Sequence, residues 1–311
     1  MSELLKPLVV VLGPTGSGKS DAALSIAGTF SGEIVNADSI QLYRGFDIGS
    51  AKTPHAERRD IPHHLIDVLD PSELCTAGEY SRRAREAIHG IASRGKLPVV
   101  VGGTGFYVRA LFDGLSTGPP RDDLVRDDLA NREQRHRGFL HRWLRRYDST
   151  AAARIHPNDG NKLMRAVEVG ILAKMPISGM FAQGRDTLKG YRPLKIILNP
   201  PRVELVKRLD ARSVEMLGGG LIDEVRALLA SGVAPTAKPF ESIGYKQALS
   251  IVLNDRPIPD ALEEMQRDTR RYAKRQMTWF RREHDATWVS GFGTDGTVRQ
   301  FILNAVVTHL K

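Results

Sequence analysis

Short apolar runs alternate with amphipathic stretches over the first 110 residues of the chain. Helical spacing of apolar residues appears in Ala22–Ala27 and Ala77–Ser93. This alternation predicts a parallel sheet with helices on both faces and ligands beyond the carboxyl ends of its strands. Runs with the length and composition of buried strands lie at Leu8–Leu12, Gly32–Ala37, His64–Val68 and Leu97–Val101.

The pattern changes near residue 114. The segment Gly114–Pro120 is rich in Gly, Pro, Ser and Thr, which is typical of a linker. Helical spacing dominates beyond it, until an apolar strand returns at Lys195–Leu198. We therefore expect an α/β core formed by residues 1–114 and 193–311, with an all-helical insertion domain at residues 115–192. Helices are predicted at Asp122–Tyr147, Thr150–Arg154, Asn161–Lys174, Val203–Leu217, Leu221–Ser231, Ala261–Glu283 and Val298–Leu310, and a last strand at Thr287–Val289.

The most specific motif is Gly13-Pro14-Thr15-Gly16-Ser17-Gly18-Lys19-Ser20, which fits G-x-x-x-x-G-K-[ST]. It lies between the first strand and the first helix, which is the context of a phosphate-binding P-loop. Backbone N–H groups and the helix N-terminus would attract two linked phosphates, Lys19 would reach the outer one, and Ser20 would hold Mg²⁺. The core is therefore expected to be P-loop NTPase-like. The alternative is a chance glycine-rich turn, and the motif does not decide whether the diphosphate belongs to a nucleotide.

Two more polar residues follow strand ends. Asp38 follows the second strand, and Thr104 follows the fourth in Gly102-Gly103-Thr104-Gly105. Both should meet the P-loop in one cleft. Asp38 fits a general base or a group beside the magnesium, and it equally fits the N-cap of the next segment. No strand of four apolar residues ends in an aspartate as in a Walker B motif, which is unusual for an NTPase.

Basic residues are in excess, with a formal net charge of +9. A polyanionic partner is one explanation, and solvated basic helix faces are the other. In the segment 267–282, Tyr272, Gln276 and Trp279 share one helix face and most cations share the other. This segment and a second basic segment in the insertion would lie beside the diphosphate cleft. Together they favour a nucleic acid as the second substrate. The insertion contributes a cluster of six arginines against one acid, Glu133: Arg132, Arg135, Arg137, Arg142, Arg145 and Arg146.

Arg208, Arg212 and Met216 recur every four residues and so line one helix face. An arginine on this face would clamp a diphosphate or form a surface ion pair. Cys75 is the only cysteine, which excludes an internal disulfide and a cysteine zinc site. No apolar run approaches the roughly 18 residues of a membrane span, and the first residues do not resemble a signal peptide. We expect an intracellular, cytoplasmic protein with neither a membrane nor an obligate protein partner.

Several longer motifs accompany the P-loop. Taken together, they resemble the bacterial tRNA dimethylallyltransferase family nearly from end to end, although the usual Gly-Thr-Ala-Lys of the family is Gly-Ser-Ala-Lys here. The motifs are Asp38-Ser39-Ile40-Gln41-Leu42-Tyr43-Arg44-Gly45, Asp47-Ile48-Gly49-Ser50-Ala51-Lys52, Pro62-His63-His64-Leu65-Ile66-Asp67, Val101-Gly102-Gly103-Thr104-Gly105-Phe106-Tyr107, Arg154-Ile155-His156-Pro157-Asn158-Asp159, Ser242-Ile243-Gly244-Tyr245 and Tyr272-Ala273-Lys274-Arg275-Gln276-Met277-Thr278-Trp279-Phe280.

The resemblance implies transfer of a dimethylallyl group from dimethylallyl diphosphate to N6 of adenosine 37, beside the anticodon of tRNAs that read codons beginning with U. It implies Mg²⁺ on Ser20 and recognition of the anticodon stem-loop. Asp38 would be the general base, and Lys19, Thr104 and Arg212 would complete the catalytic group. The diphosphate would bind Gly13, Pro14, Thr15, Gly16, Ser17, Gly18, Lys19 and Ser20. Contacts with tRNA are implied for Asp38, Ser39, Ile40, Gln41, Thr104, Arg126, Asn161, Lys162, Leu163, Met164, Arg165, Gly244 and Tyr245.

A small-molecule or nucleotide kinase with a helical lid is the alternative function, because it shares a P-loop and a nearby acid. It predicts ATP binding and needs no second basic surface. An RNA-binding module with a structural P-loop is a third hypothesis with less support.

Overall fold

The computed structural model describes residues 5–115, 118–182 and 184–311. Two compact units divide the chain, one formed by residues 1–112 and 188–311 and the other by residues 113–187. The second unit ends at residue 187, before the end expected for the insertion, 115–192. A strand of the first unit already begins at Tyr191. Part of the expected linker, residues 116–117, lies outside the described residues.

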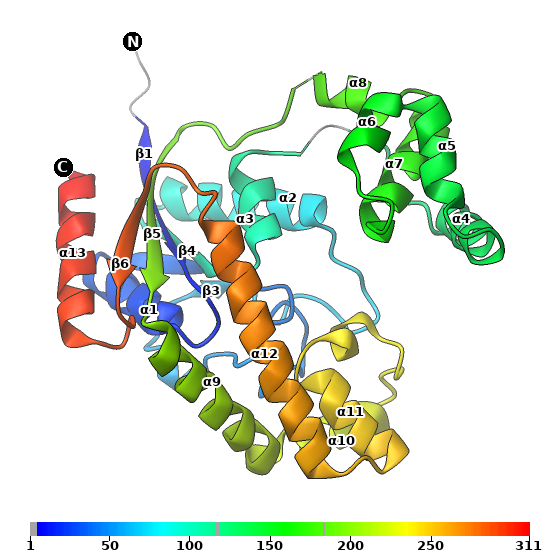
Figure 1. The fold of residues 1–311 in the computed structure, drawn as a ribbon. Helices are drawn as coiled ribbons and strands as arrows, with labels where there is room; N and C mark the ends of the chain where they lie inside the picture. The colour runs from blue at the N-terminus through cyan, green and yellow to red at the C-terminus, as the bar shows by residue number, and fades with distance from the viewer. Residues whose placement is uncertain (1–4, 116–117, 183) are drawn as a thin grey trace. The chain divides into compact units, whose positions relative to one another are not determined.

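Six parallel strands of the described chain form one sheet in the first unit, in the order β3-β2-β4-β1-β5-β6 (Figure 1). The predicted α/β class with a P-loop-like parallel sheet is therefore confirmed. The strands are β1 (Lys6–Leu12), β2 (Gly32–Asn36), β3 (His63–His64), β4 (Leu97–Gly102), β5 (Tyr191–Asn199) and β6 (Ala286–Ser290).

Helices of this unit cover both faces of the sheet. Alternate residues such as Val9 and Val11 pack with α1 and α13 on one face, while α2 and α3 lie on the other (Figure 1). Burial of these residues on both faces explains why the strands are continuous apolar runs. The helices are α1 (Lys19–Thr29), α2 (Ala77–Ser93), α3 (Gly105–Phe112), α9 (Arg202–Met216), α10 (Ile222–Ala230), α11 (Tyr245–Asn254), α12 (Ile258–Phe280) and α13 (Gly296–Leu310), with short turns η1 (His55–Glu57), η2 (Leu217–Leu221) and η3 (Lys238–Glu241).

The second unit contains helices and no strand in its described part. Its core contains Leu129, Leu140, Leu144 and Leu163, all nearly inaccessible to solvent. The helices are α4 (Asp123–Arg135), α5 (Phe139–Tyr147), α6 (Ser149–Arg154), α7 (Gly160–Ala173) and α8 (Ile177–Ala182).

Two predicted elements were wrong in detail. The strand expected at His64–Val68 ends at His64, because Leu65 and Asp67 adopt positive φ angles of 61° and 57° and turn the chain away. The helix expected at Asp122–Tyr147 is divided into α4 and α5 by Gly138, whose φ of 81° is left-handed. Helices α3, α8 and α11 were not predicted.

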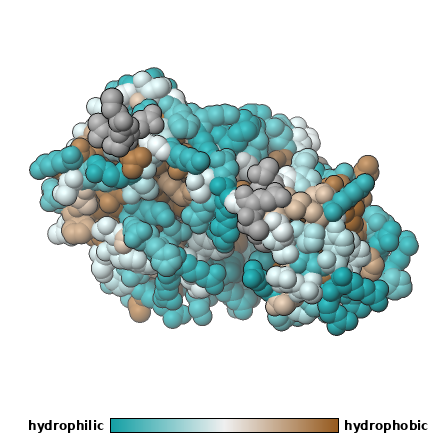
Figure 2. Space-filling model, turned by 90° about the horizontal axis from the view of Figure 1, so that it is seen from above, coloured by the Kyte–Doolittle hydropathy of each residue, from teal (hydrophilic) through white to brown (hydrophobic). Residues whose placement is uncertain are grey.

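Hydrophilic side chains cover most of the face shown in Figure 2, and hydrophobic ones form smaller patches. Within residues 5–115, 118–182 and 184–311, no helix is both long enough and apolar enough to cross a membrane.

Candidate active site

A cavity of about 600 Å³ opens beyond the carboxyl ends of neighbouring strands in the first unit. Strands β2, β4 and β1 are adjacent in the sheet, so the residues that follow them meet at one edge. The cavity walls include Lys19 and Ser20 from the P-loop, Asp38 after β2, and Arg212 from α9. Sequence positions spread over nearly 200 residues are thus brought to one site.

The P-loop begins directly after β1 and ends at the N-terminus of α1. Gly18 has a φ of 79°, and a Cβ atom there would lie 2.9 Å from the backbone nitrogen of Thr294, so only glycine fits. The N–H of Ser17 donates to the carbonyl of Pro14 at 3.2 Å and closes the turn. The first N–H groups of α1 have no partners within the helix and are available to an anion.

Two cationic side chains of the cavity, Lys19 and Arg212, are largely removed from solvent. Burial lowers the pKa of Lys19 to about 8, against the opposing effect of the Asp38 carboxylate, and Arg212 lowers it further. Burial also lowers the pKa of Arg212, with a contribution from Arg208. Titratable groups with shifted pKa values inside a cavity are a feature of functional sites.

Asp38 caps a turn with one of its two carboxylate oxygens. One carboxylate oxygen, Oδ1, accepts hydrogen bonds from the N–H groups of Ile40 at 2.9 Å and Gln41 at 3.4 Å, which makes it the cap of a turn. Within the described chain, no residue donates to the second oxygen. That oxygen is therefore available to accept a proton from a bound molecule.

Thr104 supports this corner of the cavity. Its N–H donates to the carbonyl of Ala37 at 3.2 Å, and its hydroxyl accepts from the N–H of Ser39 at 3.2 Å. Thr104 thus fixes the backbone on both sides of Asp38.

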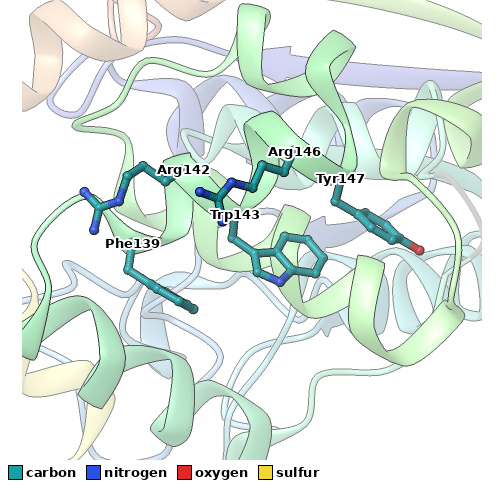
Figure 3. A pocket seen from close by; sticks show the side chains of 5 residues that line it. All are labelled: Phe139, Arg142, Trp143, Arg146 and Tyr147. Atoms are coloured by element: carbon teal, nitrogen blue, oxygen red, sulfur yellow. The ribbon is translucent and has the colours of Figure 1, made fainter.

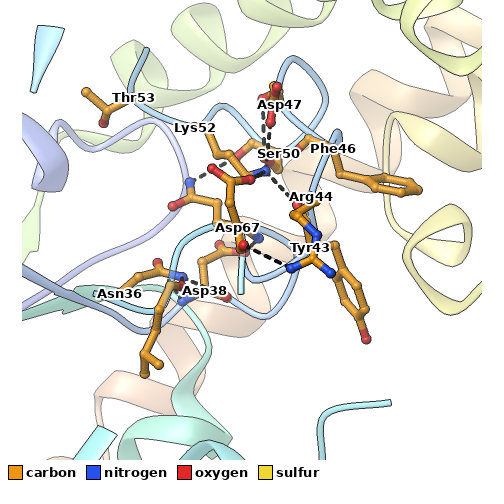
Figure 4. A network of polar contacts seen from close by, with 12 residues as sticks. Asn36, Asp38, Tyr43, Arg44, Phe46, Asp47, Ser50, Lys52, Thr53 and Asp67 are labelled. Atoms are coloured by element: carbon orange, nitrogen blue, oxygen red, sulfur yellow. Dashed lines mark hydrogen bonds and ion pairs between the residues drawn. The ribbon is translucent and has the colours of Figure 1, made fainter. Parts of the chain in front are cut away.

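The loop that follows Asp38 is held by a buried lysine (Figure 4). Lys52, whose side chain is 3% exposed, donates to the carbonyl of Tyr43 at 2.6 Å and to the carboxylates of Asp47 at 2.7 Å and Asp67 at 2.5 Å. Gln41 donates to the carbonyl of Ser50 at 3.1 Å. Residues 41–52 therefore form a fixed wall of the cavity, which gives the Gly-Ser-Ala-Lys motif a structural role.

The structure does not place Tyr245 at the surface, as a contact with tRNA requires. Its side chain is fully buried, its hydroxyl donates to Glu224, and the same hydroxyl accepts from the N–H of Gly49 at 3.1 Å. Glu224 also accepts from the N–H of Ile48 at 2.8 Å. Tyr245 and the adjoining buried Gly244 thus support the 46–50 loop from behind.

Helix α12 enters the site through the face that carries Tyr272 and Gln276, and both residues line the cavity. The side chain of Gln276 accepts from the N–H of Thr15 at 2.8 Å and donates to the carbonyl of Gly103 at 2.9 Å. Trp279 packs against Gly105, where any Cβ atom would lie 2.2 Å from the indole ring. Helical spacing predicted that these side chains share a face, but it did not reveal that the face closes the active site.

In the helical unit, two of the expected tRNA contacts are engaged in a buried ion-pair cluster. Arg126 binds both oxygens of Glu168 at 2.8 and 2.9 Å, and Arg165 binds one of them at 2.7 Å. Burial alone would raise the pKa of Glu168, but hydrogen bonds from the two arginines outweigh it and hold that pKa at about 2. Leu163 is also in the core, with 3% exposure, so its side chain is not available to RNA.

The other residues of this expected segment lie on or near the surface. Asn161 and Lys162 are exposed, and Met164 is half-buried. Lys162 is paired with Asp159 at 2.5 Å.

Helix α5 carries two parallel rows of side chains along an open cavity of about 390 Å³ (Figure 3). Phe139, Trp143 and Tyr147 form an aromatic row, in which the last two rings are 4.7 Å apart. Arg142 and Arg146 form the adjacent row. Among the described residues no carboxylate pairs with these two arginines, so their charge is not neutralised. The guanidinium of Arg142 donates to the carbonyls of Arg137 at 2.9 Å and His136 at 3.3 Å.

The fold is of the P-loop type, and its cavity brings the glycine-rich loop together with the Asp38 carboxylate. Comparison with known proteins identifies the family. The IPP transferase family model matches residues 41–283, and the isopentenyl transferase model matches residues 6–67. The chain therefore belongs to the IPP transferase family, whose bacterial members are tRNA dimethylallyltransferases, as its motifs had suggested.

Individual relatives agree. The chain is 57% identical over 304 residues to the tRNA dimethylallyltransferase of Solibacter usitatus, covering 98% of this chain and 99% of that protein. It resembles the crystal structure of the Bacillus halodurans tRNA isopentenylpyrophosphate transferase with a TM-score of 0.72 at 34% identity, covering 98% of this chain and 97% of that one. A eukaryotic dimethylallyltransferase acting on tRNA gives a TM-score of 0.84 at 29% identity, covering 97% of this chain and 80% of that one.

Proposed function

We propose that this protein transfers a dimethylallyl group from dimethylallyl diphosphate to N6 of the adenosine next to the anticodon, at position 37, in tRNAs that read codons beginning with U. The observation that carries the proposal is the shared cavity of a P-loop, two enclosed cations and Asp38. The names of the relatives support tRNA as one substrate and a dimethylallyl donor as the other.

The chemistry follows from the site. An aromatic amine is a poor nucleophile because its lone pair is delocalised, so the free oxygen of Asp38 removes a proton as the new C–N bond forms. Negative charge meanwhile grows on the diphosphate as the allylic carbon departs. Lys19, Arg212 and the N–H groups at the start of α1 face that charge and stabilise it.

The residues present fit a magnesium ion that arrives with its substrate. In the described part of the chain no three His, Cys, Asp or Glu side chains cluster as a metal cage. Mg²⁺ usually keeps several waters and takes the remaining ligands from one or two protein groups and from phosphates. Ser20, on the cavity wall, is the group that would hold the ion, and the bound ion would supply charge stabilisation to the diphosphate.

Contact with tRNA is assigned to two surfaces, each within its own unit. In the core, Asp38, Ser39, Ile40 and Gln41 line or border the cavity that the target base must enter after it leaves its stack. In the helical unit, the arginine row of α5 fits phosphates, and the neighbouring aromatic row fits an exposed apolar face of RNA.

The kinase alternative is not favoured, because the relatives are named as transferases of a prenyl group to tRNA and not of a phosphoryl group. The decisive experiment incubates purified protein with bulk tRNA and radiolabelled dimethylallyl diphosphate. Label in RNA, with no ATP or GTP consumed, is the expected result. Release of a nucleoside diphosphate in step with turnover and no label in RNA would support the kinase instead.

A further inference from the structure

Gln276 joins two loops that are distant from it in sequence. Its Oε1 accepts from the N–H of Thr15 in the P-loop at 2.8 Å, and its Nε2 donates to the carbonyl of Gly103, after β4, at 2.9 Å. The side chain is only 5% exposed. The bridge therefore runs through the protein interior, where water competes poorly for either hydrogen bond.

The chemistry of its partners fixes the orientation of this amide. A backbone N–H can only donate and a carbonyl can only accept, so the oxygen must face Thr15 and the nitrogen must face Gly103. Gly103 leaves the necessary space, because a Cβ atom there would lie 2.3 Å from Nε2. The carboxamide of glutamine provides the acceptor and the donor that these two backbone groups require.

The bridge decides which P-loop amides remain for a ligand. The N–H of Thr15 is occupied by Gln276, and that of Ser17 by the carbonyl of Pro14. The N–H groups at the start of α1, from Lys19 onward, have no partner within the helix. Holding Thr15 in place therefore aims the rest of the loop at the position of the diphosphate.

We propose that Gln276 is a positioning residue, which sets the P-loop for the diphosphate by tying it to the loop after β4. The inference rests on the proposed function for the identity of the substrate. The position of the P-loop relative to a diphosphate does not depend on the prenyl group, so it can be tested with inorganic diphosphate. Tyr272 lies one turn earlier on α12 and lines the same cavity. The helix therefore keeps the P-loop and the cavity wall at Tyr272 in a fixed position relative to each other.

The test compares Gln276→Met, which keeps the length of the side chain and removes both polar contacts, with Gln276→Asn, which keeps the amide but shortens its reach. Gln266→Met is the matched control: this glutamine lies on the same helix and donates to the carbonyl of Asp210 at 3.1 Å, away from the P-loop. Melting temperatures establish that each variant is folded.

Four quantities are measured: hydrogen exchange of the Thr15 amide without ligand, the Kd of inorganic diphosphate, the single-turnover rate of prenyl transfer, and the steady-state KM for tRNA. A loop misplaced by about 1 Å costs on the order of a hundredfold in rate. For Gln276→Met we expect faster exchange at Thr15, ten- to a hundredfold weaker diphosphate binding and a similar loss of rate by that estimate, with an unchanged KM for tRNA. Gln276→Asn should give exchange, affinity and rate values between those of Gln276→Met and the parent. Gln266→Met should give the values of the parent.

Parent-like diphosphate binding by Gln276→Met would overturn the inference. Equal losses of affinity for diphosphate and tRNA would also overturn it, because they would mean a general disturbance of α12. If the parent itself transfers no prenyl group, the proposed function fails, and the exchange and diphosphate measurements still decide the role of Gln276.

Discussion

Replacing Asp38 by asparagine should separate its chemical role from its structural one. The two side chains have the same shape, so the remaining oxygen can still accept from the N–H groups of Ile40 and Gln41. The amide nitrogen then occupies the position of the second oxygen and cannot take a proton. Asp38→Asn therefore keeps the turn and removes only the base.

The expected magnitude follows from that division. A positioned general base contributes about a hundred- to ten-thousand-fold in rate, which corresponds to roughly 3–5 kcal/mol of barrier. Stability should change little, because the turn keeps its cap. At a pH well below the pKa of Lys19, diphosphate binding should not weaken, because loss of the Asp38 carboxylate removes repulsion of an anion. Nearer that pKa the same loss also reduces the charge of Lys19, because Asp38 raises the pKa of Lys19.

The assay is single-turnover transfer from labelled dimethylallyl diphosphate at saturating tRNA, with denaturant unfolding of the same samples. Asp38→Ala is the comparison, because it removes base and cap together and should cost about 1 kcal/mol more in stability. A rate for Asp38→Asn within a few-fold of the parent, with a slow and unstable Asp38→Ala, would show that Asp38 is only a turn cap.

Three further results are expected. Affinity for dimethylallyl diphosphate should fall as pH rises through about 8, because the lowered pKa of Lys19 means that its charge is complete only below that pH; titration of Lys19→Ala should show weaker binding without this inflection, and an identical inflection would exclude Lys19. Charge reversal at Arg142, Arg145 and Arg146 should weaken tRNA binding without changing diphosphate affinity. The slope of log K for tRNA against log salt concentration should become shallower by up to about three, at roughly 0.9 for each lost phosphate contact. An unchanged slope would mean that these arginines form a solvated face. The ion pairs of Glu168 should stabilise the fold fully above its ordinary pKa of 4.5 and less as pH falls toward about 2, because its folded pKa is depressed; melting curves of Glu168→Gln should lack that part of the pH dependence, and a parent-like profile would contradict the assignment.

The local features of the site could be predicted from the sequence. A strand, a glycine-rich loop and a helix occupy consecutive positions, so the P-loop is determined within some 20 residues. Asp38 was likewise identified by its place after an apolar strand. These predictions depend on short-range periodicity and on glycine conformations, which neighbouring residues largely decide.

Contacts between distant segments were decided only by the tertiary structure. Gln276 meets Thr15 across 261 residues, and Tyr245 meets Gly49 across 196. Helical periodicity places Gln276 and Tyr272 on one face, but it carries no information about what that face packs against. Burial of Tyr245 likewise depends on how α10 and α11 pack against the 46–50 loop. The sequence therefore determined the chemistry that the chain carries, and packing determined which side chains face the ligand and which hold the loops in place.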